Sequence, residues 1–168
     1  SNQSPVSSLQ ITPIKPVRLA EPFEAVRDWA NDYAKANGRS PRIFLANMGP
    51  LPQHKARTDF VRGFFEVGGF EMIDSEGFDS PETAAQAVID SGETAVVICS
   101  SDNSYPDIVP PLVESIKSQQ PKAIVMLAGY PKEQIQAHKT ASIDAFIHLG
   151  TDCLALNQWL QGRMATVE

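Results

Sequence analysis

Apolar runs and helical patterns alternate along most of the chain. From residue 43 onward, short apolar runs bounded by polar or turn-forming residues are typical of strands buried on both faces of a parallel sheet. Between these runs, apolar residues recur at three- and four-residue spacing, as on the buried face of a helix. The predicted strands lie at residues 43–46, 70–73, 94–99, 123–127 and 145–149. The alternation predicts an α/β fold, a flavodoxin-like three-layer sandwich around a five-stranded parallel sheet.

Prolines and capping residues mark where the predicted helices begin and end. Proline disrupts the interior of a helix. We therefore expect the helix after the first strand to begin only after Pro52. Ser80 is a suitable N-cap with Pro81 at the first helical position, and Gly92 is a suitable C-terminal stop. Pro131 opens the helix that follows the fourth strand. These positions predict short connections between strands and helices.

The N-terminal part differs from the rest of the chain. Residues 1–20 mix Ser, Pro, Gln and Lys without periodicity, which indicates a linker or tail. Residues 21–40 predict a helix that precedes the α/β domain at residues 41–168. Its apolar face consists of Phe23, Val26, Trp29, Ala30 and Tyr33. We expect this face to pack on the domain that follows or on a partner subunit.

Length and composition narrow the classes of function. The chain has 168 residues, of which 42% are hydrophobic, enough for one domain with a substantial core. A net charge of −6 argues against nucleic-acid binding, because phosphate recognition depends on clustered Lys and Arg. No apolar run approaches the roughly 20 residues that cross a bilayer, so no membrane span is expected. Cys99 and Cys153 belong to no CxxC pair, which suits a reducing, cytoplasmic location.

Two families with this architecture do not fit the loops that follow the strands. A response-regulator receiver needs acidic residues after its first strand, where this chain has Asn47 and Met48. It also needs a lysine after the fifth strand, where Leu149 and Gly150 stand, so only Asp102 could serve. A flavodoxin cradles phosphate with a loop rich in hydroxyls and glycine. The loop MGPLPQH has one glycine, no hydroxyl and two prolines, so neither function is expected.

A more specific pattern comes from three segments. They read ANMGPLPQHKARTDFVRGFFEVGGFE, VVICSSDNSYPDIVPPL and LAGYP. Residues from about 42 to 163 as a whole resemble the C-terminal cobalamin-binding domain of methylmalonyl-CoA mutase and its relatives. The three segments are similar in particular to the small, non-catalytic subunit of that family.

The resemblance points to His54 as the candidate cobalt ligand. The family carries D-x-H-x-x-G after its first strand, where the histidine is the lower axial ligand of cobalt and the aspartate orients the ring. Counting back from FFEVGGFE places His54 on the ligand position. Pro52 then takes the position of the aspartate, and Arg57 takes that of the glycine. The orienting carboxylate is therefore missing, and a long charged residue replaces a small one.

The other pocket positions of the family fall on three later loops. The resemblance places its S-x-L signature on Cys99, Ser100 and Ser101, its paired glycines on Ala128 and Gly129, and its G-P-G run on His148, Leu149 and Gly150. A one-residue shift in the first of these remains open. Most of the small residues have become larger. Each misfit in a close-packed site costs on the order of 1 to 3 kcal/mol, so several together would close the pocket.

The resemblance implies a supporting role without chemistry. As a domain of the small subunit, the chain would form a heterodimer with the large catalytic subunit. That subunit performs the adenosylcobalamin-dependent isomerisation of methylmalonyl-CoA and succinyl-CoA. This chain alone is expected to be inactive and to hold no cofactor. Two alternatives stay open: a genuine cobalamin-binding domain with His54 on cobalt, and a free-standing regulatory module that uses the fold for another ligand.

Several candidate residues have an ordinary structural explanation as well as a functional one. Cys99 is expected to be a small buried hydrophobe, and His148 to fill the pocket. The polar loop at residues 100–104 could bind a small anion, although turn and capping chemistry explains it as well. Trp29 and Tyr33 are expected to pack against the core rather than to anchor a partner.

Overall fold

Five parallel strands form one sheet. A computed structural model describes the backbone of residues 14–167 and the side chains of residues 21–166. The strands are β1 (Arg42–Asn47), β2 (Glu71–Ile73), β3 (Ala95–Cys99), β4 (Ile124–Ala128) and β5 (Ala145–Ile147). Their order across the sheet is β2-β1-β3-β4-β5, and every neighbouring pair is parallel. This is the flavodoxin-like order, so the predicted fold class is confirmed.

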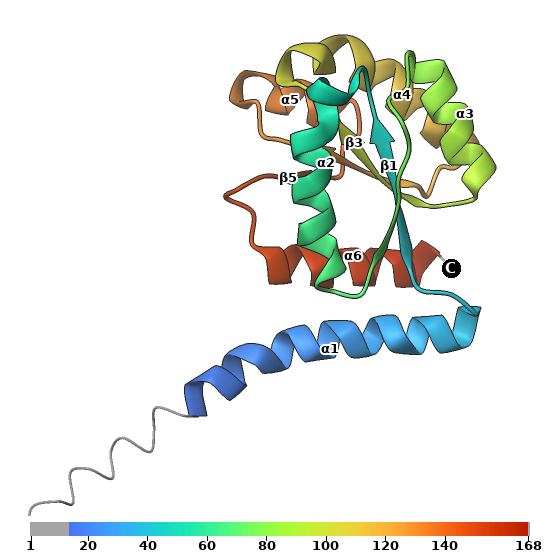
Figure 1. The fold of residues 1–168 in the computed structure, drawn as a ribbon. Coiled ribbons are helices and arrows are strands. Elements are labelled where there is room, and N and C mark those ends of the chain that lie inside the picture. The colour runs from blue at the N-terminus through green and yellow to red at the C-terminus, as the bar shows by residue number, and fades with distance from the viewer. Residues whose placement is uncertain (1–13, 168) are drawn as a thin grey trace, which may run out of the picture.

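Helices cover both faces of this sheet (Figure 1). They are α1 (Ile14–Asn37), α2 (Leu51–Glu66), α3 (Pro81–Ser91), α4 (Tyr105–Gln119), α5 (Ile135–Thr140) and α6 (Cys153–Val167), and the short 3-10 turns η2 (Asp102–Ser104) and η3 (Lys132–Gln134) precede α4 and α5. One core packs α2 and α6 on the sheet, with Phe65 and Leu160 fully buried. The other packs α3 and α4, with Val88 and Leu112 fully buried. β3 and β4 are therefore buried on both faces, which explains their uninterrupted apolar sequences.

The predicted boundaries of α3 are confirmed in atomic detail. The Ser80 hydroxyl accepts a hydrogen bond from the Thr83 amide at 3.2 Å, as an N-cap does. Pro81 occupies the first helical position, and Gly92 ends the helix in the left-handed region with φ +73°.

Two boundaries at the carboxyl edge of the sheet differ from the prediction. α2 begins at Leu51 and accommodates Pro52 in its first turn, where a proline has no intrahelical N–H to lose. β5 ends at Ile147, two residues before the predicted end, because it is an edge strand with a single neighbour. His148 and Leu149 therefore belong to the loop between β5 and α6.

Helix α1 begins earlier than predicted. It starts at Ile14, within the stretch predicted as a linker, and Pro22 lies inside it rather than in its first turn. The prediction used Pro22 as a start signal, whereas the structure places it inside the helix, where a proline removes one intrahelical hydrogen bond. The linker prediction for residues 1–13 lies outside the described residues. Within the described part of the chain, none of the helices combines the length and hydrophobicity that a bilayer span requires.

The apolar face of α1 packs on the domain itself. Val26 and Ala30 are buried, and the Trp29 ring lies 6.0 Å from that of Phe70. The Gln161 side chain of α6 donates a hydrogen bond to the Val26 carbonyl at 2.9 Å. Figure 1 shows α1 below α6, at the end of the sheet where the strands begin. The predicted packing on the following domain is therefore observed.

Two further features hold α1 in place. Gly69, with φ +88°, approaches α1 so closely that a Cβ atom there would lie 2.6 Å from the Cβ of Ala30. Beyond the helix, Arg39 and Arg42 contact the same oxygen of the buried Glu93 carboxylate, at 2.8 and 2.6 Å. The segment between α1 and β1 is thus fixed to the start of β3.

Candidate functional site

The carboxyl edge of the sheet collects the loops that carried the predicted site. Asn47, at the end of β1, is buried and donates to the Asp74 carboxylate and to the Ser75 carbonyl, both at 2.8 Å. Its amide oxygen accepts a hydrogen bond from the Thr58 hydroxyl of α2. Asn47 therefore ties β1 to α2 and to the loop after β2.

His54 lies on the first turn of α2, under the loop between β2 and α3. Its side chain is buried, and its Nδ1 atom has no hydrogen-bond partner among the described residues. A Cβ atom at Gly77 would lie 3.0 Å from the His54 Cε1 atom and 1.7 Å from the Gly49 carbonyl oxygen. The ring edge therefore faces the loop at residues 74–79 and contributes to a hollow of about 770 Å³ beside it.

Arg57 lies one turn further along α2 and lines a different hollow from His54. Its guanidinium donates to the Ser100 carbonyl at 2.7 Å, lies 2.8 Å from the Asp102 carboxylate and stands over the ring of Tyr105 at 5.7 Å. Burial alone would lower the pKa of Arg57, but Asp102 and Tyr105 together raise it. The guanidinium is therefore a fixed cation with three defined contacts.

The Arg57 guanidinium also fills the space beside Gly129. This glycine follows β4 with φ +122°, a conformation that only glycine adopts readily. A Cβ atom there would lie 2.9 Å from the Arg57 Nη1 atom. In the family that the chain resembles, both positions carry small residues. Here the two positions lie side by side, and the Arg57 side chain fills the space beside Gly129.

A cavity of about 450 Å³ remains between α2 and the ends of β4 and β5. Arg57, Phe60, Ala128, Gly129 and Ile147 contribute to its wall, and His54 does not. At the mouth, the rings of Tyr130 and His148 stack with a centroid distance of 4.5 Å and an interplanar angle of 26°. The predicted cobalt ligand and the predicted glycine pair therefore face different hollows.

The hydrogen bonds of Ser100 give it a structural role. It is fully buried, and its hydroxyl donates to the Met48 carbonyl at 3.0 Å while accepting from Gln53 and Ser104 at 2.8 and 2.9 Å. The hydroxyl therefore ties the loop after β3 to Met48 after β1 and to Gln53 of α2.

Ser101 and Gly150 take part in turns. The Ser101 carbonyl accepts a hydrogen bond from the Ser104 hydroxyl at 2.7 Å, and Ser101 stands at the N-cap of η2. The Gly150 amide donates to the His148 Nδ1 atom at 3.2 Å in the loop after β5. Neither contributes to the cavity between β4 and β5, whereas Ala128 and Gly129 do.

Tyr105 is the residue of this edge that sequence reasoning did not single out. It is fully buried, accepts a hydrogen bond from the Ser100 amide at 3.0 Å and donates one to the Ala128 carbonyl at 2.5 Å. Burial raises the pKa of its hydroxyl, so the neutral donor persists. A tyrosine among polar loop residues just before Pro106 was the available signal, because a buried hydroxyl needs a partner.

Cys99 behaves as the predicted buried hydrophobe. It is fully buried at the end of β3, and burial raises the pKa of its thiol to about 12. Among the described residues, no group of three or more His, Cys, Asp or Glu side chains is placed to hold a metal ion.

The fold and its edge define a class, a flavodoxin-like α/β domain, and solved structures agree. A CheY-like protein, TadZ, from Pseudomonas aeruginosa is 19% identical with a TM-score of 0.57, covering 72% of this chain and 94% of that one. The receiver domain of the sensor histidine kinase PA1611 from the same organism is 8% identical with a TM-score of 0.52, covering 74% and 98%. At such identities the likeness concerns the fold alone.

Sequence comparisons are more specific. The methylmalonyl-CoA mutase small subunit of Streptomyces virginiae is 32% identical over 140 residues, which are 83% of this chain and 21% of that subunit. A probable small subunit of Mycobacterium tuberculosis is 38% identical over 108 residues, 63% of this chain and 17% of the relative. No family model matches the chain.

The chain is therefore similar to methylmalonyl-CoA mutase small subunits over most of its length, and the predicted resemblance to their cobalamin-binding-like domain is confirmed. It spans about a fifth of the length of these relatives. A large subunit from Propionibacterium freudenreichii is 25% identical over 121 residues, so related stretches occur in both kinds of subunit.

Proposed function

We propose that the chain is a non-catalytic domain of a mutase small subunit, that it supports the catalytic large subunit, and that its cleft does not accept cobalamin. The proposal that cobalamin does not bind rests on one observation: the Arg57 guanidinium lies against Gly129. In the family that the sequence resembles, this glycine pair leaves room for the nucleotide tail of the cofactor. Here the Arg57 guanidinium occupies part of the corresponding room, and a cavity of about 450 Å³ remains beside it.

The cost of moving Arg57 supports this proposal. The side chain would have to leave both the Ser100 carbonyl and the Asp102 carboxylate. The charged hydrogen bond to the Ser100 carbonyl is worth about 1.5–3 kcal/mol, whereas the Asp102 side chain is 45% exposed, so the ion pair adds no more than about 1 kcal/mol. A ligand must offset this cost before it gains any contact.

The orientation of His54 also argues against a cobalt site. The histidine lines the hollow beside the loop after β2 and does not line the cavity between β4 and β5. Asp74, one of the carboxylates in the hollow that His54 lines, is already engaged by Asn47 and by Arg62. Pro52 supplies no carboxylate, so the ring lacks the second-sphere acceptor that orients a metal-bound imidazole.

The test is a titration with hydroxocobalamin followed by visible absorbance. We expect no spectral change with the wild-type protein. A saturable shift that the His54→Ala variant abolishes would overturn the cofactor part of the proposal. Arg57→Gly serves as the companion variant, because it restores the family residue and shows whether Arg57 alone blocks the cleft.

A second candidate function, a cobalamin carrier, is favoured by one observation. The buried Nδ1 atom of His54 has no partner in the described part of the chain, as expected of a ring that awaits a ligand. In a carrier, His54 would hold the cobalt and Gly129 would line the tail. The same titration decides between the two candidates, since only the carrier predicts a shift that depends on His54.

The partner part of the proposal has its own test. The purified chain is mixed with the intact mutase large subunit of P. freudenreichii, and complex formation is followed by size-exclusion chromatography with light scattering. Co-elution supports a mutase partner. TadZ is the matched control, because it has the same fold and no such sequence relation. Equal behaviour of the two proteins would contradict the proposal.

A further inference from the structure

The sequence contains a single Asn-Gly pair, Asn37 and Gly38. In such a pair the backbone nitrogen of the glycine can attack the side-chain carbon of the asparagine. A bond forms between Gly38 N and Asn37 Cγ, and the side-chain nitrogen leaves as ammonia with the amide proton of Gly38. Water then opens the succinimide ring to aspartate or isoaspartate. Glycine favours this reaction because it has no side chain to hinder the attack and reaches the required conformations readily.

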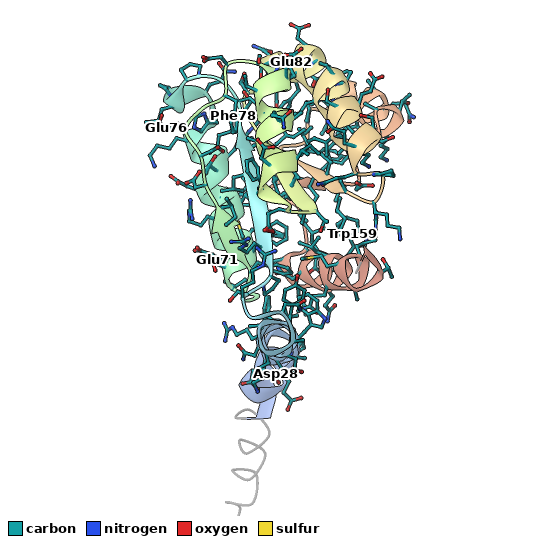
Figure 2. The ribbon with its side chains drawn as sticks, turned by 90° about the vertical axis from the view of Figure 1, so that its right-hand side faces the viewer. Asp28, Glu71, Glu76, Phe78, Glu82 and Trp159 are labelled. Atoms are coloured by element: carbon teal, nitrogen blue, oxygen red, sulfur yellow. The ribbon has the colours of Figure 1, made fainter. Side chains whose placement is uncertain are left out.

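The pair lies at the exposed end of α1. Asn37 is the last residue of this helix, and Gly38 follows it with φ +78°, the left-handed conformation that often ends a helix. Both residues are exposed. Figure 2 shows Asp28 of α1 at one end of the molecule and Glu82 of α3 at the other. Because the pair precedes the start of β1 at Arg42, it lies at the amino end of the sheet, apart from the candidate functional site.

In the folded protein, both reacting groups are held by hydrogen bonds to the last turn of α1. The Gly38 amide donates to the Ala34 carbonyl at 2.8 Å, and the Asn37 side chain donates to the Tyr33 carbonyl at 2.9 Å. These bonds must break before the Gly38 nitrogen can approach the Asn37 Cγ atom. Helix ends open at a much lower cost in free energy than a whole domain. The reaction therefore requires only a local opening, with the rest of the chain folded.

We propose that Asn37 is a site of spontaneous deamidation, and that opening of the last turn of α1 sets its rate. The inference goes beyond the proposed function and does not depend on it. Both products weaken this end of the helix. A carboxylate cannot donate to the Tyr33 carbonyl, and its charge is unfavourable at the negative end of the helix dipole. Isoaspartate also adds a methylene group to the main chain two residues before Arg39, whose contact with Glu93 at 2.8 Å holds the following segment.

The test incubates the purified chain in slightly alkaline buffer, either folded or unfolded in guanidinium chloride, and follows each asparagine by peptide mass spectrometry. We expect a gain of one mass unit at Asn37, with aspartate and isoaspartate peptides separated by chromatography. The rate should be about ten-fold lower in the folded chain, since two hydrogen bonds must open first. Asn103, which is exposed and followed by serine, is the internal control and should stay unmodified.

Two outcomes of this incubation overturn the inference. A folded chain that stays unmodified at Asn37 after many half-lives of the unfolded reaction rules out the site. Equal rates in the folded and unfolded chains rule out control by the helix end. Gly38→Ala should slow the reaction in the unfolded chain, because a Cβ atom hinders the attack, and an unchanged rate would contradict the succinimide route.

A pair of variants tests the control by helix opening. Gly69→Ala brings a Cβ atom to 2.6 Å from that of Ala30 in α1, so it should raise the folded rate at Asn37 toward the unfolded rate. Gly63→Ala in α2 has no neighbour within 4 Å and should leave the rate unchanged. Equal rates in the two variants overturn this control. Should Gly69→Ala not fold, the wild-type protein in denaturant below its unfolding transition replaces it, and a rate that does not rise there has the same meaning.

The consequence for the helix has a separate readout. Asn37→Asp reproduces one of the two products, and Asn31→Asp makes the same change of charge at an exposed position inside α1. We expect faster proteolysis within α1 in the Asn37→Asp variant than in the Asn31→Asp variant. Equal rates of proteolysis would show that the product does not weaken the end of the helix.

Discussion

The Arg57 guanidinium fills the space beside the Cα atom of Gly129, although Arg57 lies on α2 and Gly129 on the loop after β4. A Cβ atom on Gly129 would lie 2.9 Å from the Arg57 Nη1 atom. Arg57 is at the same time held by the Ser100 carbonyl and by Asp102. The conformation of the loop after β4 is therefore coupled to a side chain of α2.

We expect Gly129→Ala to lower the free energy of unfolding by about 2–3 kcal/mol, through backbone strain at φ +122° and the clash with Arg57. In an Arg57→Ala background the cost should fall by about 1 kcal/mol, because the clash is removed and the strain remains. Urea unfolding followed by circular dichroism measures both. Gly92→Ala is the control for a positive φ in open space. Strict additivity of Gly129→Ala and Arg57→Ala would contradict the coupling.

Tyr105→Phe should cost about 1–3 kcal/mol, because the Ser100 amide and the Ala128 carbonyl would be left buried and unpaired. Tyr130→Phe, at an exposed ring, should change stability by less than about 0.5 kcal/mol. Thermal and urea denaturation of the two variants provide the comparison. Equal effects would mean that the Tyr105 hydroxyl is not a structural bridge.

Gly69→Ala should loosen α1 from the domain. The new Cβ atom would lie 2.6 Å from that of Ala30, so we expect a cost of about 2–3 kcal/mol and faster proteolysis within α1. Ala30→Gly should recover part of this loss when combined with it. Gly38→Ala, which has a similar φ and no neighbour within 4 Å, should cost about 1 kcal/mol. If the two glycine variants behave alike, the close approach of α1 carries no energy.

The buried His138 should make the folded protein less stable in mild acid. Burial lowers its pKa below the ordinary value of 6.5, against the opposing effect of Asp102. The unfolded chain therefore binds the proton more readily. The contribution of His138 is present above pH 6.5 and is lost as the pH falls through the folded pKa.

The measurement is urea unfolding at about pH 7.5 and about pH 5. The wild-type protein should lose more stability between these values than His138→Gln does. Gln136→Ala on the exposed face of α5 is the control and should follow the wild type. A His138→Gln variant with the wild-type pH dependence would contradict the assignment.

Cys99 should be unreactive in the folded protein. It is fully buried with a thiol pKa of about 12, so a Cys153→Ser variant should show no labelling by a thiol reagent near pH 8 until it is unfolded. The absorbance of the coloured thiolate that the reagent releases on labelling gives the number of cysteines that have reacted. Rapid labelling of the folded variant would show that the end of β3 opens readily.

The sequence predicted the fold because the sheet is buried on both faces. β3 and β4 had to be apolar throughout, and the capping residues Ser80 and Gly92 are chemically distinct. The start of α1 at Ile14 escaped prediction because Pro22 resembles a helix start when tertiary support is unknown. The contacts of α1 with the domain lie at Val26, Trp29 and Ala30, beyond this proline in the sequence.

The candidate site was only partly predictable. Its loops followed from the strand ends, and the replacement of a small family residue by Arg57 was visible. The surroundings of the side chains were not, because His54 and Arg57 lie one turn apart on the same helix and still line different hollows. Which hollow each would meet depends on neighbours such as Gly77 and Gly129, far away in the sequence.

The close approach of the backbone at Gly49 and Gly77 affects how readily reagents, as well as ligands, reach the His54 ring. Since any side chain at position 77 would collide with the Gly49 carbonyl, a larger residue there would lift the connection away from α2. Solvent would then reach the imidazole of His54. The rate at which this ring is modified by an electrophile such as diethyl pyrocarbonate is therefore controlled by a residue that has no side chain.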